Sequence, residues 1–172
     1  MQTLYLFPQF CTLCHFPTGG EYMTILVVDD EGDQRLLMKN LLAIEGWNIL
    51  VAENGDDALA NMAREKVDMI ISDIYMPVMD GIKLHRTVRE LQGYETLPFL
   101  FVSAYDDQHT MDAVKNPKLD GFFRKGGPLS ELKEWVRFLT TPEDQRPKIP
   151  PGQRQKLGSP GSARDRSRDF RR

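Results

Sequence analysis

Acidic, hydroxyl and amino side chains follow four of the five short apolar runs in this sequence. In chain order, the runs 25–28, 69–72, 99–102 and 121–124 are followed by Asp29 and Asp30, by Asp73, by Ser103 and by Lys125. The remaining run, 48–52, ends without such a group. Carboxylates bind hard cations such as Mg²⁺, while hydroxyl and ammonium groups bind phosphoryl oxygens. If the runs end at one place, these residues form a site for a cation and a phosphoryl group, with an aspartate available for phosphorylation.

The segments between the runs have the periodicity that would bring those ends together. We expect strands over 25–28, 49–52, 69–72, 99–102 and 121–124, and helices over 33–45, 54–66, 82–91, 107–114 and 129–139. This alternation predicts an α/β fold, a doubly wound five-stranded parallel sheet with helices on both faces. Right-handed crossovers favour the flavodoxin-like strand order 2-1-3-4-5. The carboxyl ends of its strands share one edge, where ligands bind.

Two of the expected helices have apolar residues at the spacing of a buried face. In the first helix, that face is predicted to consist of Leu36, Leu37, Asn40, Leu41 and Ile44, with Gly46 ending the helix. In the second helix, Asn54 is the predicted N-cap, and the inward residues are Ala58, Leu59, Met62 and Ala63.

The length and composition predict one globular domain with extensions. Of 172 residues, 41% are hydrophobic and 27% charged. The patterned part is 23–141, which leaves 1–22 as a disordered extension or the product of a misassigned start before Met23. Residues 142–172 predict a disordered tail rich in Pro, Gly and Arg, and within it 143–172 carries a net charge of +5. Without a signal peptide or membrane span, we expect a cytoplasmic protein with no membrane contact.

Four motifs, in this order, resemble the response-regulator receiver domain of two-component signalling. They are Val27-Val28-Asp29-Asp30-Glu31, Ser72-Asp73-Ile74-Tyr75-Met76-Pro77-Val78-Met79-Asp80-Gly81, Val102-Ser103-Ala104 and Phe122-Phe123-Arg124-Lys125. Each motif is weak alone, but together they cover about 23–140. The resemblance implies a histidine kinase or phosphotransfer protein as phosphoryl donor, Mg²⁺ as cofactor and a downstream protein target.

The resemblance also assigns the acceptor and the cation ligands. Asp73 matches the phospho-acceptor. Asp29 and Asp30 match the acidic pair, which would hold Mg²⁺ together with Asp73 and the backbone carbonyl of Tyr75. The ion would offset the repulsion between the carboxylate and the incoming phosphoryl group.

Three further residues match the parts that respond to phosphorylation. Lys125 would pair with Asp73 before the reaction and with a phosphoryl oxygen afterwards. Ser103 matches the switch hydroxyl and Phe122 the switch aromatic. Inward movement of Ser103 would make room for Phe122 and shift a two-state surface over 106–114, 121–124 and 129–139.

The sequence departs from the family pattern at one position and is distinctive at two others. Gly126 replaces the proline that usually follows the lysine through a cis peptide, so the geometry of the Lys125–Gly126 bond stays open. Tyr75 and Tyr105 occupy the positions that tune phosphoryl lifetime. Neither side chain activates water at neutral pH, so we expect a long-lived phosphorylated state.

Other functional classes have less support. Cys11-Thr12-Leu13-Cys14-His15 matches the C-x-x-C-H haem attachment pattern, but it lies in an unpatterned segment and lacks further zinc ligands nearby. A phosphatase of the haloacid-dehalogenase type would need an aspartate where Tyr75 stands. Without a nucleotide-binding motif, we do not expect an enzyme. The remaining alternative is a receiver-like interaction module that works without phosphorylation.

The region after residue 140 contains no pattern of a DNA-binding or catalytic output domain. We therefore expect a stand-alone response regulator that acts by contact with another protein and does not bind nucleic acid through its domain. The sequence leaves open whether it is a monomer or a homodimer.

Overall fold

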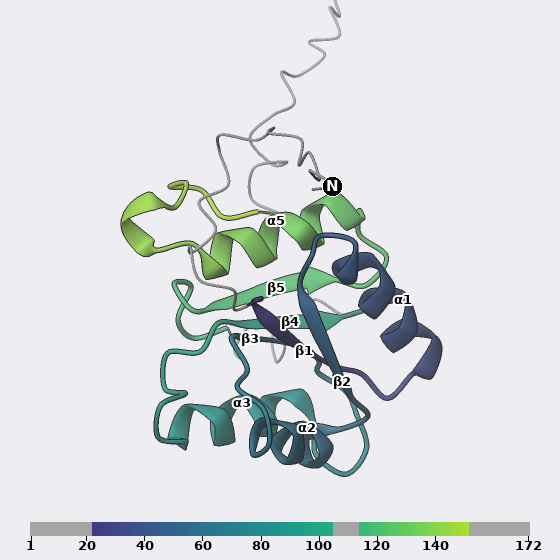
Figure 1. Ribbon diagram of the computed structural model, residues 1–172. Helices are drawn as coiled ribbons and strands as arrows, with labels where there is room; N and C mark the ends of the chain where they lie inside the picture. Colours follow the sequence, from purple (N-terminus) through teal and green to yellow (C-terminus); the bar gives the residue numbers. More distant parts are fainter. Residues whose placement is uncertain (1–21, 105–113, 152–172) are drawn as a thin grey trace, which may run out of the picture.

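The computed structural model describes residues 22–104 and 114–151, which form a three-layer α/β domain (Figure 1). The strands are β1 (Thr24–Val28), β2 (Asn48–Ala52), β3 (Met69–Asp73), β4 (Phe99–Ser103) and β5 (Asp120–Arg124). The helices are α1 (Gly32–Ala43), α2 (Gly55–Met62), α3 (Gly81–Glu90), α5 (Leu129–Thr140) and the 3-10 turn η1 (Glu143–Gln145). The helix expected over 107–114 falls almost wholly outside the described residues.

The five strands form one parallel sheet in the order β2-β1-β3-β4-β5, which confirms the predicted fold. The register brings the strand ends to one level. Val28 lies opposite both Ala52 and Ser72, and Ser103 lies opposite Arg124. The groups that follow the strands therefore emerge at a single edge of the sheet.

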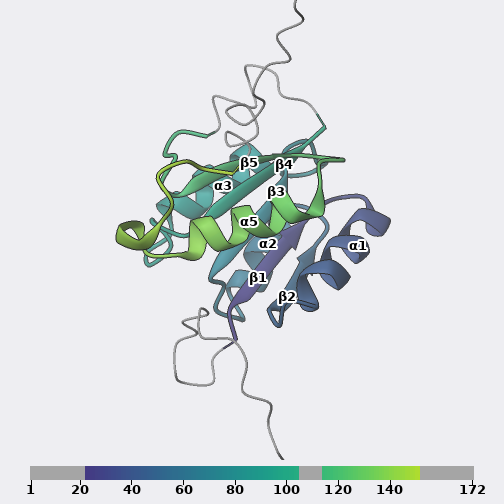
Figure 2. The same cartoon turned by 90° about the horizontal axis from the view of Figure 1, so that it is seen from above.

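Helices cover both faces of the sheet, with α1 and α5 on one face and α2 and α3 on the other (Figures 1 and 2). As a result, β1, β3 and β4 are buried at all five of their positions. This is why these strands read as continuous apolar runs in the sequence. Among the described residues, no helix is both long and apolar enough to cross a membrane.

The predicted buried face of α1 is wrong. Met38 and Leu42 are the buried residues of the helix, whereas Leu36, Leu37 and Ile44 are 58%, 51% and 77% exposed. Apolar residues do recur at helical spacing, but α1 has more of them than one face can hold. Because the helix packs over β1 and the edge strand β2, only a narrow stripe is covered.

The second helix is shorter than predicted. It ends at Met62, and Ala63 is exposed, because the chain turns there to bring Val67 into the core before β3. Asn54 is the N-cap, accepting a hydrogen bond from the Asp57 N–H at 3.0 Å. Ala58 and Met62 are buried and Leu59 is half-buried, as predicted.

The first ten residues of the expected tail are ordered and return to the domain. Arg146 donates hydrogen bonds to the carbonyls of Thr141 at 2.6 Å and Leu139 at 2.7 Å, and a short one to the carbonyl of Lys118. Its guanidinium lies 5.5 Å from the ring centroid of Phe138. Residues 142–151 thus fold back onto the end of α5. The expectations for 1–21 and 152–172 concern residues outside the described structure.

Candidate functional site

The sheet edge brings together the acidic groups and the lysine that the sequence singled out. Carboxylate oxygens of Asp29, Asp30 and Asp73 all lie within 4.8 Å of one another. The Lys125 ammonium donates a short hydrogen bond to Asp73 Oδ2 and lies 2.9 Å from Asp29 Oδ2. Asp29 and Asp73 are 1% and 6% exposed, whereas Asp30 is exposed. The result is a buried ion pair beside an open acidic rim.

The loop after β3 holds Asp73 by backbone contacts. The N–H of Tyr75 donates to Asp73 Oδ1 at 3.3 Å, and the N–H of Gly81 donates to the Ile74 carbonyl at 2.9 Å. A Cβ at Gly81 would lie 2.1 Å from the Asp73 carbonyl oxygen, so only glycine fits there. Val78, in the same loop, has a φ of 69°, a strained value for a β-branched residue.

The turn after β1 is held through Asp29. Its carboxylate Oδ1 accepts the Glu31 N–H at 2.9 Å, and its own N–H donates to the Ala52 carbonyl at 3.2 Å. Its carbonyl accepts a hydrogen bond from Arg35 at 2.5 Å. Sequence reasoning did not assign a role to Arg35. The sequence feature that could have pointed to Arg35 is a basic residue in the first turns of a helix that follows an acidic pair.

Burial and the ion pair shift the ionisation of both partners. Burial raises the pKa of Asp73, and the charge of Asp29 adds to this, while the Lys125 ammonium opposes it without cancelling it. Burial by itself lowers the pKa of Lys125, but the hydrogen bonds and charges of Asp73 and Asp29 outweigh burial and raise it. The folded protein therefore disfavours the ionised form of Asp73 and favours the protonated form of Lys125.

The acidic groups suit a hard divalent cation. Asp29 Oδ2 is buried, and the Lys125 ammonium lies 2.9 Å from it. Exposed Asp30 leaves the site open to water. Mg²⁺ binds proteins through one or two carboxylates and keeps several waters, so two of these three carboxylates could bind it directly and the third through a bound water.

Ser103 and Phe122 lie on the neighbouring strands. Ser103 is fully buried at the end of β4, and its carbonyl accepts the Lys125 N–H at 2.8 Å. Phe122 is half-buried and packs against the core cluster under α2 and α3. No described peptide bond is cis, so the Lys125–Gly126 bond is trans. Gly126 has a φ of 84°, and the chain turns there. Tyr75 is 46% exposed, and Tyr105 lies outside the described residues.

Comparison with known proteins identifies the family. Residues 25–137 match the family described as "Response regulator receiver domain". This chain belongs to that family. The receiver is 39% identical over 117 residues to an uncharacterized 14.6 kDa protein in the sodA1 3′ region of Leptolyngbya boryana, covering 68% of this chain and 87% of that protein.

Two further matches are a longer regulatory protein and a protein of known structure. The receiver is 35% identical to the transcriptional regulatory protein TrcR of Mycobacterium tuberculosis, covering 70% of this chain but only 46% of TrcR. It also matches the crystal structure of response regulator protein TrrA from Thermotoga maritima in complex with Mg²⁺ and BeF, at 32% identity and a TM-score of 0.59. That match covers 68% of this chain and 98% of TrrA.

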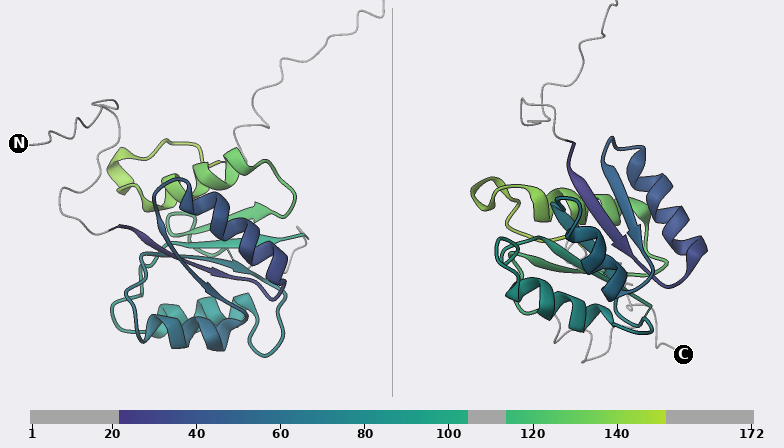
Figure 3. Two further views of the ribbon diagram at one scale, coloured as in Figure 1. Left: turned by 45° about the vertical axis from the view of Figure 1, so that its right-hand side comes forward. Right: turned by 60° about the horizontal axis from the view of Figure 1, so that its bottom comes forward.

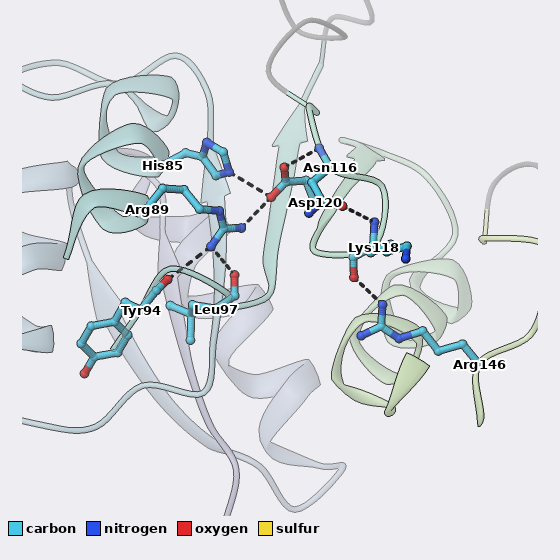
Figure 4. Close-up of polar contacts among 8 residues, drawn as sticks. All are labelled: His85, Arg89, Tyr94, Leu97, Asn116, Lys118, Asp120 and Arg146. Atoms are coloured by element: carbon cyan, nitrogen blue, oxygen red, sulfur yellow. Dashed lines mark hydrogen bonds and ion pairs between the residues drawn. The ribbon is translucent and has the colours of Figure 1, made fainter. Parts of the chain in front are cut away.

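A second polar cluster of the receiver, which the sequence did not reveal, lies at the opposite end of β5 (Figure 4). Asp120, 2% exposed, accepts from Arg89 at 2.6 Å and contacts His85 at 2.9 Å, while its other oxygen accepts the Asn116 N–H at 3.0 Å. Burial by itself raises the pKa of Asp120, but the hydrogen bonds from His85 and Arg89 outweigh it and lower the pKa. This cluster ties α3 to the start of β5, far from the acidic edge.

Proposed function

We propose that this chain is a single-domain response regulator that is phosphorylated on Asp73 with Mg²⁺ and switches its surface to control a protein partner. The observation that carries the proposal is the Lys125 ammonium shared between the buried carboxylates of Asp29 and Asp73, beside exposed Asp30. A structural ion pair needs one carboxylate. Three carboxylates around one lysine leave negative charge that a bound cation would neutralise.

The chemistry follows from the positions of these groups. A carboxylate oxygen of Asp73 attacks the phosphorus atom of the donor, a P–O bond forms, and the bond from phosphorus to the donor atom breaks. Asp29, Asp30, Asp73 and the Tyr75 carbonyl would hold Mg²⁺, which would supply positive charge to offset the repulsion between the two anions. Lys125 then passes from the carboxylate to a phosphoryl oxygen, so its charge remains paired throughout.

The switch is proposed to act through Ser103 and Phe122. The Ser103 hydroxyl would donate to a second phosphoryl oxygen, which draws the end of β4 toward the site. Phe122, half-buried in the neighbouring strand β5 and opposite Phe101, would move into the space released. The family's kinase or phosphotransfer protein is the proposed donor, and a downstream protein is the proposed target. The chain itself is proposed to be cytoplasmic and to bind no nucleic acid through its domain.

The test is phosphorylation by acetyl phosphate in Mg²⁺, followed by intact-protein mass spectrometry. We expect one phosphoryl group on the unchanged chain, stable to acid and labile to base, and none on Asp73→Asn. The matched control is Asp80→Asn, which alters an exposed carboxylate in the same loop and preserves an N-cap type. It should label normally.

Two results would contradict the proposal. Equal labelling of Asp73→Asn would remove Asp73 from its role. An unlabelled wild-type chain that keeps its fold and still binds a protein partner would favour the interaction module that works without phosphorylation.

A further inference from the structure

The end of β2, which carries no reactive group, contacts the loop that contains Asp29 and the loop that follows Asp73. β2 ends at Ala52, and its carbonyl accepts the Asp29 N–H at 3.2 Å. Three residues later, the Gly55 N–H donates to the Met79 carbonyl at 3.0 Å, in the loop that follows Asp73. In sequence, α1 precedes β2 and α2 follows the turn. Figure 3 shows these two helices on opposite faces of the sheet. The turn 52–55 thus contacts the acidic loops from the β2 side.

Arg35 adds a side-chain link between α1, the acidic turn and this same segment. One guanidinium nitrogen donates to the Asp29 carbonyl at 2.5 Å, and the other lies 3.3 Å from a Glu53 carboxylate oxygen. The Arg35 side chain is only 16% exposed, while Glu53 is 72% exposed. A planar guanidinium that bonds two partners at fixed angles restricts both more than a flexible ammonium would.

Local hydrogen bonds fix the shape of the turn. The Glu53 N–H donates to the Asp57 carboxylate at 3.1 Å, and the Asp57 N–H donates to Asn54 at 3.0 Å. Gly55 packs closely against the second loop, since a Cβ there would lie 2.5 Å from Met79 Cγ.

We propose that Arg35 and the turn 52–55 form a clamp that positions the carboxylates of Asp29 and Asp73 for the divalent cation. Arg35 is then a positioning residue, which acts on the acidic site through the Asp29 backbone and through Glu53. The inference rests on the proposed function, because it concerns the affinity of that site for Mg²⁺.

Charge and position make opposite predictions for the loss of Arg35. A positive charge near the site repels a cation, so removing it without changing the geometry would strengthen Mg²⁺ binding. Loss of the two hydrogen bonds frees the acidic turn and would weaken binding. Outer contacts of this kind are worth about tenfold or more in metal affinity. The direction of the change therefore separates a positioning role from a purely electrostatic one.

The experiment is calorimetric titration of the full chain with MgCl₂. We expect the Kd of Arg35→Met to rise about tenfold, and that of Arg35→Lys to fall between Arg35→Met and the unchanged chain, because it keeps the charge but not the paired geometry. Lys39→Met removes one charge from an exposed position on the same helix and should leave the Kd unchanged. The acetyl phosphate labelling rate of Arg35→Met should recover at saturating Mg²⁺, which a general loss of folded protein would not allow.

A second variant keeps the inference testable if Arg35→Met does not fold. Gly55→Ala leaves all charges in place and displaces the Met79 side chain, so it should also raise the Kd for Mg²⁺. Unchanged or tighter binding by folded Arg35→Met, or by Gly55→Ala if Arg35→Met does not fold, would overturn the clamp while leaving the proposed function intact. A wild-type chain that neither binds Mg²⁺ nor accepts a phosphoryl group would overturn both.

Discussion

At the scale of single residues, the site is a balance between a buried anion and a buried cation. Asp73 gains the hydrogen bond of Lys125 but loses hydration and lies near Asp29, so its pKa is raised above the ordinary value. Its ionised form is therefore less favourable in the folded protein than in the unfolded chain. The site sacrifices some folding stability to keep a carboxylate ready for a cation and a phosphoryl group.

This balance predicts a pH-dependent effect of Asp73→Asn in the absence of Mg²⁺. With a raised folded-state pKa, the penalty from Asp73 is fully present above that pKa. It is lost as pH falls through that pKa toward the unfolded value. Asp73→Asn should therefore stabilise the protein most at pH values above the folded-state pKa of Asp73, and the difference in free energy of unfolding should shrink as the pH falls through that pKa. Urea unfolding followed by tryptophan fluorescence would measure it, and a difference that grows as pH falls would contradict the assignment.

Tyr75 gives a kinetic prediction at the same scale. Its side chain is 46% exposed, two residues beyond Asp73, and it offers no group that activates water at neutral pH. We expect Tyr75→Asn, alone or with Tyr105→Ala, to speed hydrolysis of the phosphorylated protein, about tenfold for each 1.4 kcal/mol removed from the barrier. Tyr75→Phe is the control and should retain the slow rate. Loss of the phosphoryl group over time, followed by mass spectrometry, is the measurement, and an unchanged rate in the double variant would refute shielding.

At the scale of elements, the segment after α5 acts as a cap. The last carbonyls of a helix lack partners within it, and Arg146 supplies hydrogen bonds to the carbonyls of Leu139 and Thr141. The same guanidinium reaches Lys118 in the turn before β5 (Figure 4). One side chain thus holds α5 and the last strand together.

We expect Arg146→Gln to lower the free energy of unfolding by about 1–3 kcal/mol, because the partly buried carbonyls of Leu139 and Thr141 would lose charge-assisted hydrogen bonds. Exposed Lys148→Gln changes one charge two residues away and is the control. The nearby pair Lys118–Glu143 is 63% exposed on both sides, so Glu143→Gln should cost less than Arg146→Gln. Urea titration would rank the three variants. An Arg146 effect no larger than that of Lys148 would show that the cap contributes nothing.

At the scale of the whole molecule, α1 and α5 form one joined layer. Glu45, just after α1, accepts from Lys133 at 2.7 Å and from Arg137 at 2.6 Å, both on α5. A shift of α5 would therefore be transmitted to the end of α1. The proposed switch starts in the sheet on which this layer packs, at Ser103 and β5.

Amide hydrogen exchange would locate that switch. With Mg²⁺ and beryllofluoride as a phosphoryl mimic, we expect protection to change in β5 and α5 and to stay constant in α2. A ligand can shift the domain only by the difference in its affinity for the two states. Asp73→Asn, treated identically, should show no change. Changes confined to α2 would place the output elsewhere.

The sequence by itself determined the sheet, its strand order and the residues at its carboxyl edge. Strands buried on both faces read as continuous apolar runs, and parallel strands bring whatever follows them to one edge. Asp29, Asp30, Asp73 and Lys125 could be grouped from these local patterns alone. Glycine at position 81 could likewise be linked to its motif, although the reason for it, the 2.1 Å approach to Asp73, required coordinates.

Only the tertiary structure decided which way α1 faces, what Arg35 holds, and where 142–151 goes. Periodicity gives the angular spacing of apolar residues around a helix, but an edge helix has several apolar stripes, and the sheet selects one. The partners of Arg35, Arg146 and Asp120 are carbonyls or side chains up to 35 residues away, and most carbonyls are indistinguishable in a sequence. Such contacts depend on where the backbone passes in space, which is fixed only when the layers pack together.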